Sequence, residues 1–355
     1  MRRAGKTLIG PCPVCSSDRA SRTATRFECD ADGWCCAVCV DGGDVIKLVQ
    51  KVEGKSFLEA VEWLGGAREI DAARAAELDA ARRKKAEQRE RENNHFRDRE
   101  RRTLWNIWLN AAPIAGTPAQ AYLERRGLEA PPGARLKCVV EMPYFVARGH
   151  DQVAIHRGPA MVAPIIRPDG HFGGLHFTYI DMSAPKGKLA LKDPETGELL
   201  PAKKSRGSKK DGHIELIPVK DPPALVIGEG IEKVLAVWLA LARAGRDLTA
   251  TAFRTSVDLG NLGGRAGETV THPTLKTEKG RAQRVPGPLP DLATPGIPVP
   301  DSIEQIIILG DSTSDRLTTR CAIARAAGRW ARVGRAIRVA WSPDGADFDD
   351  LLRAA

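Results

Sequence analysis

The chain has 355 residues and carries 54 Lys and Arg against 45 Asp and Glu, a formal net charge of +9. This length suits two or three domains rather than one, and the positive balance favours a polyanionic partner, with nucleic acid as the first candidate. No stretch approaches the roughly 18 consecutive apolar residues of a membrane span, and no apolar signal core follows Met1. The composition therefore excludes a membrane protein and predicts a cytoplasmic one.

Six of the eight cysteines lie between residues 12 and 39, which in an intracellular protein indicates a metal site rather than disulfides. Two Cys-x-x-Cys turns separated by twenty residues match the spacing of a tetrahedral zinc ribbon. The predicted ligands are Cys12, Cys15, Cys36 and Cys39. Because four thiolates leave no open coordination position, we expect a structural zinc ion that builds a binding surface.

Two further cysteines, Cys29 and Cys35, lie in the same stretch. Cys35 could in principle replace Cys36, but the two-residue spacing to Cys39 favours Cys36. The segments 27–29 and 33–35 can pair as a hairpin around residues 30–32. This hairpin is expected to lie between the two pairs of ligands.

The first 221 residues divide into three segments. Residues 1–66 are predicted to form the zinc-ribbon domain, which ends in a helical pattern from Val45 to Leu64. Residues 67–112 read as a charged helical linker, in which a solvated helix rich in ion pairs leads into a docking helix at 103–111. Residues 113–221 mix short apolar runs with turns, which indicates a mixed α/β unit.

The last segment, residues 222–355, alternates strands and helices and predicts a parallel-sheet α/β domain. Strands are expected at 224–228, 251–257, 306–309 and 337–341, and helices at 231–244 and 318–333. A Pro/Gly-rich excursion over 260–300 interrupts this alternation. An excursion of about 40 residues exceeds the usual connection length, so it is either a functional flap or poorly ordered. The predicted fold class is therefore multidomain α/β.

Two acidic residues follow buried strands in this last segment. The run Leu-Val-Ile-Gly-Glu-Gly at 225–230 places Glu229 at a strand end, and Ile-Ile-Ile-Leu-Gly-Asp at 306–311 places Asp311 at another. Carboxylates at the carboxyl ends of adjacent parallel strands converge at the edge of the sheet, where they can hold divalent cations and phosphates. The alternative is that both are helix N-terminal acids that complement the helix dipole.

A lysine-rich stretch precedes this domain. Its basic residues are Lys203, Lys204, Arg206, Lys209 and Lys210. Because Gly and Ser flank them, the stretch is predicted to be a flexible basic segment that contacts the phosphates of nucleic acid or nucleotide. An ordinary solvated loop is the alternative interpretation.

Four short motifs mark the N-terminal domain. They are Cys-Pro-Val-Cys at 12–15, Cys-Ala-Val-Cys at 36–39, Gly-Gly-Asp-Val-Ile at 42–46 and Lys-Ser-Phe-Leu-Glu-Ala-Val at 55–61. Together they resemble the zinc-binding domain of bacterial and phage DNA primases. Many members have His at one ligand position of the first turn, where this chain has Cys15. The resemblance implies that the domain binds single-stranded template and helps to choose where priming begins.

The acidic motifs resemble the TOPRIM domain that bacterial-type primases share with type IA and type II topoisomerases and some nucleases. Glu229-Gly230 matches its first motif. The second motif is normally Asp-x-Asp, whereas this chain reads Asp311-Ser-Thr-Ser-Asp315, with Thr313 at the usual second acid. Some phage primases carry a further acid at the place of Asp315, so the resemblance implies that Asp315 binds metal as well.

The C-terminal run at 345–352 resembles the acidic closing segment of phage primases. The resemblance places Asp347 and Asp349 near the metals, and helix capping is the alternative.

The combined resemblance implies a DNA primase of the phage or mobile-element kind. Such an enzyme makes short oligonucleotide primers on single-stranded DNA from nucleoside triphosphates. Its implied cofactor is Mg²⁺ or Mn²⁺ held by Glu229, Asp311 and Asp315. Because the chain has no Gly-x4-Gly-Lys-Ser/Thr phosphate loop, any replicative helicase is expected to be a separate protein.

Two other functions stay open. The first is a catalytically silent DNA-binding protein of a mobile element, which Thr313 would allow. The second is a TOPRIM nuclease or topoisomerase. The only tyrosines that could act as its nucleophile are Tyr122, Tyr144 and Tyr179, and none has a recognisable setting.

Overall fold

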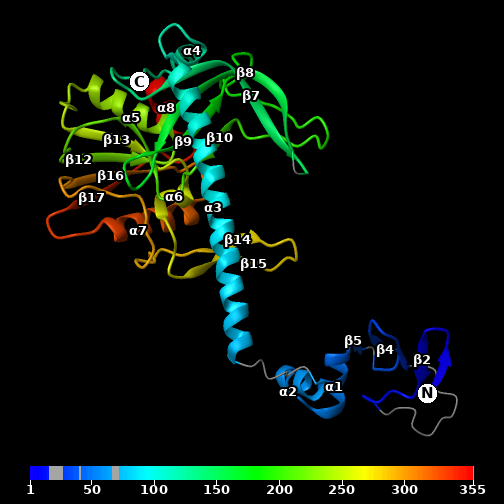
Figure 1. The fold of residues 1–355 in the computed structure, drawn as a ribbon. Coiled ribbons are helices and arrows are strands. Elements are labelled where there is room, and N and C mark those ends of the chain that lie inside the picture. Colours follow the sequence, from blue (N-terminus) through cyan, green and yellow to red (C-terminus); the bar gives the residue numbers. More distant parts are fainter. Residues whose placement is uncertain (16–26, 40, 66–71, 150, 355) are drawn as a thin grey trace. The chain divides into compact units, whose positions relative to one another are not determined.

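A computed structural model describes residues 1–15, 27–39, 41–65, 72–149 and 151–354 (Figure 1). The chain divides into two compact units, Met1–Glu90 (unit 1) and Arg91–Ala355 (unit 2). Within the described ranges, no helix combines the length and the apolar composition that a membrane crossing requires. The division falls inside the stretch that the sequence assigns to a charged linker.

Unit 1 begins with an antiparallel sheet in which each strand pairs with the next along the chain. Its strands are β1 (Arg2–Ala4), β2 (Thr7–Gly10), β3 (Phe27–Cys29), β4 (Trp34–Cys36) and β5 (Asp41–Gly43). The expected hairpin around residues 30–32 is present, and its second strand begins one residue later than predicted. Asp30 stabilises the turn, because its Oδ1 accepts hydrogen bonds from the backbone N–H groups of Asp32 and Gly33.

Two short helices follow this sheet. They are α1 (Val45–Glu53) and α2 (Phe57–Trp63). Asp44 caps the first, and Ser56 with Glu59 forms a reciprocal capping box at the second. Gly54 adopts a left-handed φ of 66° and ends α1. The continuous helical pattern of the sequence therefore splits into two helices at this glycine.

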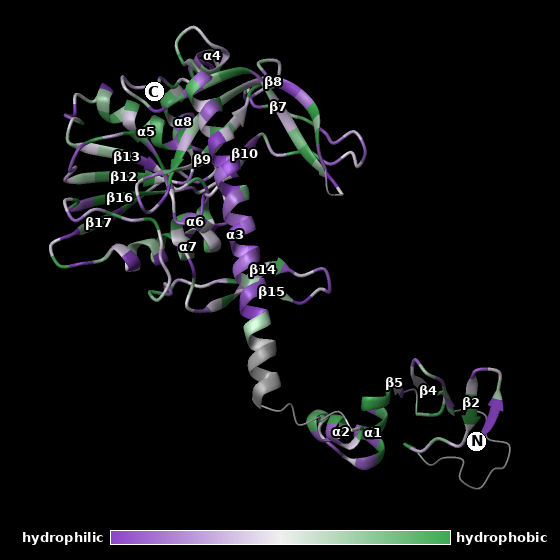
Figure 2. Cartoon of the chain, in the orientation of Figure 1, coloured by the Kyte–Doolittle hydropathy of each residue, from purple (hydrophilic) through white to green (hydrophobic). Residues whose placement is uncertain are grey.

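A single helix, α3 (Ala72–Asn110), spans the region predicted to contain a linker helix and a separate docking helix. Its side chains from residue 80 to 99 are exposed, and the helix is strongly hydrophilic along this length (Figure 2). Near its end Leu104 is fully buried, and Ile107 and Trp108 pack beside it in a core cluster with strands of unit 2. The end of α3 therefore docks as the sequence predicts.

The first half of unit 2 is rich in strands. Its elements are β6 (Ala112–Pro113), α4 (Pro118–Arg125), β7 (Lys137–Arg148), β8 (Asp151–Ile166), β9 (Phe172–Tyr179), β10 (Lys203–Gly207) and β11 (His213–Ile217). Strands β7 and β8 form a long antiparallel hairpin, β9 pairs with β8, and β10 pairs with β9 at the edge of the sheet. Because β11 pairs with both β8 and β13, the sheet continues without a break into the second half.

The second half carries four parallel strands, in the order β13-β12-β16-β17. Its main elements are β12 (Ala224–Gly228), α5 (Ile231–Arg243), β13 (Thr251–Thr255), β16 (Gln305–Gly310), α7 (Arg316–Trp330), β17 (Ala336–Trp341) and α8 (Phe348–Ala354). Side chains alternate along each strand, so Val226 packs in the core cluster that contains α5, and Leu225 packs in the one that contains α7. The two helices thus cover opposite faces, and the carboxyl ends of the strands share one edge.

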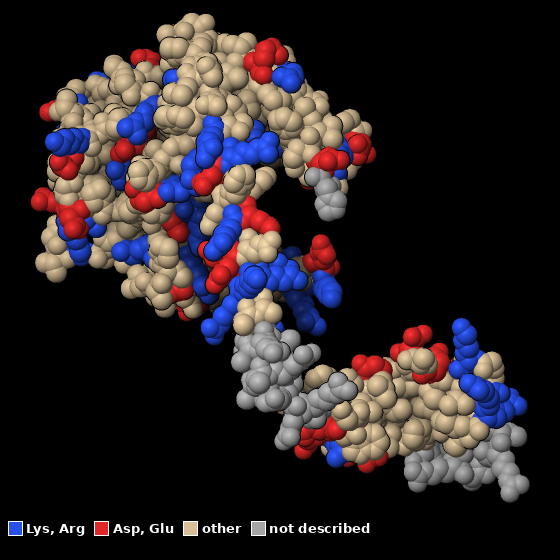
Figure 3. Space-filling view, in the orientation of Figure 1, with Lys and Arg blue, Asp and Glu red and all other residues tan. Residues whose placement is uncertain are grey.

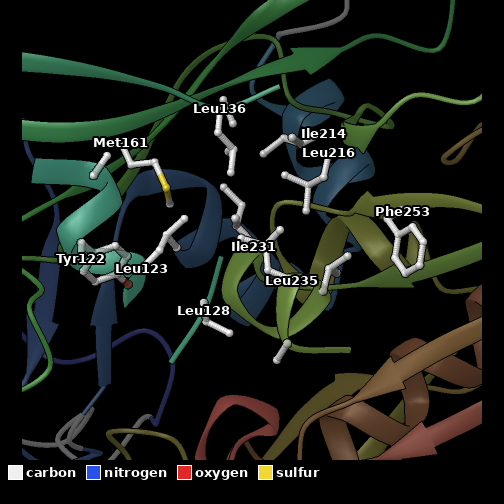
Figure 4. Close-up of a cluster of buried hydrophobic side chains, with 14 of the residues drawn as sticks. Tyr122, Leu123, Leu128, Leu136, Met161, Ile214, Leu216, Ile231, Leu235 and Phe253 are labelled. Atoms are coloured by element: carbon white, nitrogen blue, oxygen red, sulfur yellow. The ribbon is translucent and has the colours of Figure 1, made fainter. Parts of the chain in front are cut away.

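The largest core cluster joins both halves of unit 2 (Figure 4). Tyr122 of α4 and Met161 of β8 are fully buried in it, together with Leu235 of α5 and Phe253 of β13. Residues on both sides of the predicted boundary at 221 therefore share one hydrophobic core.

The excursion over 260–300 has regular structure. It contains α6 (Leu259–Gly263) and the hairpin of β14 (Thr269–Lys276) and β15 (Ala282–Pro286). Two arginines of α7 hold it, since Arg325 donates a hydrogen bond to the carbonyl of Pro286 and Arg329 donates one to that of Asp291. Of the two interpretations open from the sequence, the poorly ordered loop is therefore wrong.

Candidate metal centres

The four predicted zinc ligands converge in unit 1. The Sγ atoms of Cys12, Cys15, Cys36 and Cys39 lie within 4.8 Å of one another, and those of Cys15 and Cys36 are 4.0 Å apart. Zn–S bonds of about 2.3 Å place the sulfurs of a tetrahedral site roughly 3.8 Å apart. This thiolate cluster therefore fits a zinc ion. Among the described residues it is the only such group of metal-binding side chains.

The alternation of β4 decides between the two neighbouring cysteines of that strand. Cys36 is buried, whereas Cys35 is exposed, and adjacent residues of a strand point to opposite faces. Burial alone would raise the pKa of Cys36, but hydrogen bonds from the backbone of Cys39 and Val38 lower it overall. A lowered pKa favours the thiolate form that binds metal. The sequence-based choice of Cys36 is thus supported by the geometry.

The two acidic residues of the second half lie at one edge of the parallel sheet. Glu229 follows β12 and Asp311 follows β16, and these strands are parallel neighbours. The pKa of half-buried Glu229 is raised mainly by burial and further by the charges of Asp311 and Asp258, against the opposing effect of Lys233. Within the described part of the chain, no group donates a hydrogen bond to the Glu229 carboxylate that could lower its pKa. We call the sheet edge that carries Glu229 and Asp311 the acidic edge.

Asp311 is held on both of its oxygens. The Nζ of Lys233 lies 3.1 Å from Oδ2, while Thr313 donates its backbone N–H and its hydroxyl to Oδ1 at 2.8 and 2.6 Å. Burial would raise the pKa of Asp311, but the bonds from Thr313 and the charge of Lys233 lower it overall. Thr313, at the position where the sequence resemblance expects an acid, therefore positions Asp311 rather than adding a carboxylate.

Lys233 is the residue of the acidic edge that sequence reasoning missed. It lies in the first turn of α5 and is only 5% exposed. Its positive charge acts on Glu229, Asp311 and Asp347. A cation between carboxylates reduces the repulsion that would otherwise separate them. A lysine in the helical turn directly after the Glu-Gly motif is the signal that could have revealed it.

Asp315 is engaged elsewhere. Its Oδ1 accepts a hydrogen bond from the backbone N–H of Thr318 and caps α7, and its Oδ2 lies 2.9 Å from His272 Nε2. The Nδ1 of His272 accepts from the backbone N–H of Leu275, so the proton lies on Nε2 and is donated to Asp315. Asp315 therefore links the β14–β15 hairpin to α7. Its role as a metal ligand stays a prediction.

Asp347 and Asp349 have different surroundings. Asp349 is fully buried and forms an ion pair with Arg126, the C-cap residue of α4. The pKa of Asp347 is raised by burial first and then by Asp349 and Asp311, and Lys233 lowers it. Asp347 therefore interacts electrostatically with the acidic edge, whereas Asp349 belongs to the buried core of unit 2.

The predicted flexible basic segment is a β-strand over its first half. Lys203–Gly207 form β10, which pairs along its length with β9. Lys203 Nζ lies 2.8 Å from Glu232, which also accepts a hydrogen bond from Tyr122. Lys204 Nζ lies 4.0 Å from the ring centre of Tyr144, and Arg206 pairs with Glu100 of α3 at 2.8 Å. The expectation of flexibility is wrong here, because sheet bonds and side-chain partners hold these residues.

The alternation of β10 divides the basic set. Lys203 lies near the acidic edge, where its charge partly opposes the rise that burial causes in the pKa of Glu229. Lys209 lies on the same side and pairs with Asp258 at 2.6 Å. Lys204 and Arg206 make their contacts with β7 and α3 instead. Lys210 is exposed. One predicted cluster is therefore two separate basic groups.

The fold and the sites define a two-unit α/β protein with a zinc-type thiolate cluster in one unit and a carboxylate-bearing sheet edge in the other. Residues 98–216 match the model of a family described as a domain of unknown function, DUF7146. A search of curated proteins finds no match by sequence.

Several solved structures are similar to the chain. One is a DNA primase domain from Pseudomonas aeruginosa, at 15% identity and a TM-score of 0.40, covering 71% of this chain and 74% of that one. Another is a DnaG primase catalytic domain bound to single-stranded DNA, at 18% and 0.41, covering 74% and 78%. A third is the E. coli primase catalytic core, at 19% and 0.36, covering 73% and 74%.

Proposed function

We propose that this protein is a DNA primase, which synthesises short oligonucleotide primers on single-stranded DNA. The observation that carries the proposal is the acidic edge, where Glu229 and Asp311 follow neighbouring parallel strands and are electrostatically coupled. Carboxylates in this position suit a divalent ion that holds phosphates. The TOPRIM-like motif around Glu229 and the primase-like motifs of unit 1 narrow the chemistry to nucleotidyl transfer.

In the proposed reaction the 3′-hydroxyl of the primer attacks the α-phosphate of a nucleoside triphosphate, and pyrophosphate leaves. Glu229 and Asp311 would hold Mg²⁺ or Mn²⁺, which lowers the charge barrier to this attack when bound. Lys233 keeps Asp311 in place and adds a fixed positive charge beside the phosphates. Lys203 and Lys209 lie on the same side and would guide the triphosphate.

The segments of the chain would divide the work. Residues 1–66 are proposed to capture the template through the surface that the zinc builds, because four thiolates leave no position for catalysis. Residues 67–112 would act as the tether. Residues 113–221 would form the first part of the catalytic core, and 222–355 the TOPRIM domain. The primers would serve the replication of a phage, a plasmid or a chromosome, together with a separate helicase.

A second candidate function, that of a catalytically silent DNA-binding protein, is favoured by the partners of Asp311. Lys233 and Thr313 occupy its two oxygens, so a metal ion has to compete with both. With threonine at position 313, the edge also lacks the second acid of the usual motif. A catalytically silent DNA-binding protein would keep the thiolate cluster and the basic groups and lose only the chemistry.

A topoisomerase is disfavoured by the burial of every tyrosine. Tyr122 and Tyr144 are 0% exposed, and Tyr179 is 3% exposed. A phenol in such a position cannot reach a DNA phosphate.

The deciding experiment is primer synthesis by the full chain on single-stranded DNA with labelled nucleotides and either Mg²⁺ or Mn²⁺. Glu229→Gln and Asp311→Asn are each expected to lower the rate by about 100-fold or more, the scale of losing one preorganised charge contact. Wild-type rates in both variants would remove the acidic edge from the mechanism. No product from the wild type with either metal would favour the silent protein.

Asp315→Asn is the matched control, because it changes one carboxylate of the same motif. If Asp315 only links the hairpin to α7, its replacement lowers the rate much less than Asp311→Asn does. A loss as large as that of Asp311→Asn would make Asp315 a metal ligand.

A further inference from the structure

A cavity of about 690 Å³ lies in unit 2, on the side of β10 where Lys204 and Arg206 make their contacts. Its walls come from α3, from the β7–β8 hairpin and from the edge strand β10. The residues that matter for its chemistry are Phe96, Arg97, Glu100, Phe145, Lys204 and Arg206. Figure 3 shows Lys and Arg side chains gathered along α3 and next to it, beside a hollow in this face. The volume is in the range of ordinary ligand sites.

The aromatic residues of the cavity are accessible. Phe96 is 70% exposed on α3. Phe145 is half-buried on β7, and the guanidinium of Arg206 lies 5.9 Å from its ring centre. Two phenyl rings thus line one open cavity, and such rings are surfaces on which unpaired bases stack.

The charges of the cavity favour an anion. Arg97 is exposed and has no carboxylate partner among the described residues, and Lys204 donates to the carbonyl of Phe145 rather than to an acid. Glu100 is the one acid of the lining, and Arg206 neutralises it at 2.8 Å. The lining therefore carries a net positive charge beside its aromatic rings. The edge strand β10 adds backbone groups, because β9 is its one partner strand in the part of the chain that the structure describes.

We infer that this cavity binds single-stranded DNA, with a base stacked on Phe96 and phosphates beside Arg97 and Lys204. The inference rests on the proposed function, for which single-stranded DNA is the template, and it gives the template a site apart from the acidic edge. A nucleoside triphosphate fits the cavity less well, because the cavity offers only two cations without a carboxylate partner, Arg97 and Lys204, to its triphosphate group.

The test is the affinity of the full chain for a fluorescein-labelled oligo-dT of twelve nucleotides, measured by anisotropy without nucleotides or divalent metal. Phe96→Ala and Phe96→Leu are expected to weaken binding by about tenfold, within the range of one lost base–aromatic stack. Phe96→Trp should bind as the wild type does. Because Phe96 is exposed, all three variants should keep the wild-type melting temperature.

Arg97→Ala tests the phosphate contact. We expect weaker binding and a plot of log K against log salt that is shallower by about 0.7, the value for one phosphate on a single strand. Arg246→Ala is the matched control, since Arg246 is an exposed arginine outside the cavity lining, and it should leave both affinity and slope unchanged. A 5-iodouracil oligonucleotide, irradiated on the wild type, should crosslink to the peptides that contain Phe96 or Phe145.

Several outcomes would overturn the inference. They are wild-type affinity in Phe96→Ala, wild-type affinity in Phe96→Leu, and a wild type that does not bind the oligonucleotide. An increase in the KM for nucleotide at unchanged DNA affinity would assign the cavity to nucleotide instead. Because binding is measured without catalysis, a DNA site that responds to Phe96 in a protein that makes no primer would support this inference and contradict the proposed function.

Discussion

The two candidate metal centres differ in what holds their ligands. The core of unit 1 around the thiolate cluster consists of Cys12 and Cys36 with Phe27 and Trp34, so half of its buried residues are ligands. The acidic edge instead projects from a sheet with hydrophobic clusters on both faces. In unit 1 a metal bound to these cysteines would complete the fold, because few other side chains are buried there. In unit 2 the fold exists first and positions the carboxylates.

The largest expected effect tests the first half of this comparison. Cys36→Ser should remove zinc and unfold unit 1, because binding energies of about 10–16 kcal/mol for structural zinc are also folding energies. Cys35→Ser, one residue away on the exposed face of β4, should keep one zinc per chain. Metal analysis and limited proteolysis check both. Retention of zinc by Cys36→Ser would show that the cluster is assembled differently.

The next effect tests whether unit 2 is held by its own core. Arg126→Ala leaves the buried carboxylate of Asp349 without its partner, which should destabilise unit 2 by about 3–5 kcal/mol. Arg243→Ala removes an exposed pair with Glu129 and should cost less than about 1 kcal/mol. Urea denaturation measures both, and the zinc content should not change. Equal stabilities of the two variants would place the Arg126–Asp349 pair outside the folding core.

The smallest effect concerns the free-energy cost of burying the charge of Glu229 at the acidic edge. Burial raises the folded pKa of Glu229 above its usual 4.5, so the ionised group disfavours the folded state at neutral pH. Glu229→Gln should therefore melt a few degrees higher than the wild type at pH 7 in EDTA. The difference should shrink as pH falls through the folded pKa and vanish below about 4.5. Calorimetry across this range measures it.

Asp311→Asn should show the opposite sign, because the pKa of Asp311 is lowered in the folded state by Thr313 and Lys233 despite its burial. The stability that Asp311 contributes is present above its usual pKa of 3.8 and is lost as pH falls through the folded value. At pH 7 the variant should melt lower than the wild type. The same sign in both variants would contradict the arrangement of charges described for this edge.

Local patterns made much of this protein predictable. The zinc ligands follow from two short turns whose spacing already brings the sulfurs together, and the structure places all four within 4.8 Å. The strands 224–228 and 337–341 and the helix after Glu229 were also expected within one or two residues, because apolar periodicity and glycine signals act over short distances.

Contacts between distant segments decided the rest. Lys233 reaches Asp311 only because β12, which precedes α5, pairs with β16. Asp315 contacts His272, which lies in a hairpin 43 residues earlier. Strand alternation divides the basic stretch, because neighbouring side chains of β10 point to opposite faces. Lys203 therefore contacts Glu232, 29 residues away, and Arg206 contacts Glu100, 106 residues away. By itself the sequence determined which residues are candidates for the chemistry, because spacing and residue type are local. Only the tertiary structure decided their partners, because sheet order and helix packing bring remote side chains together.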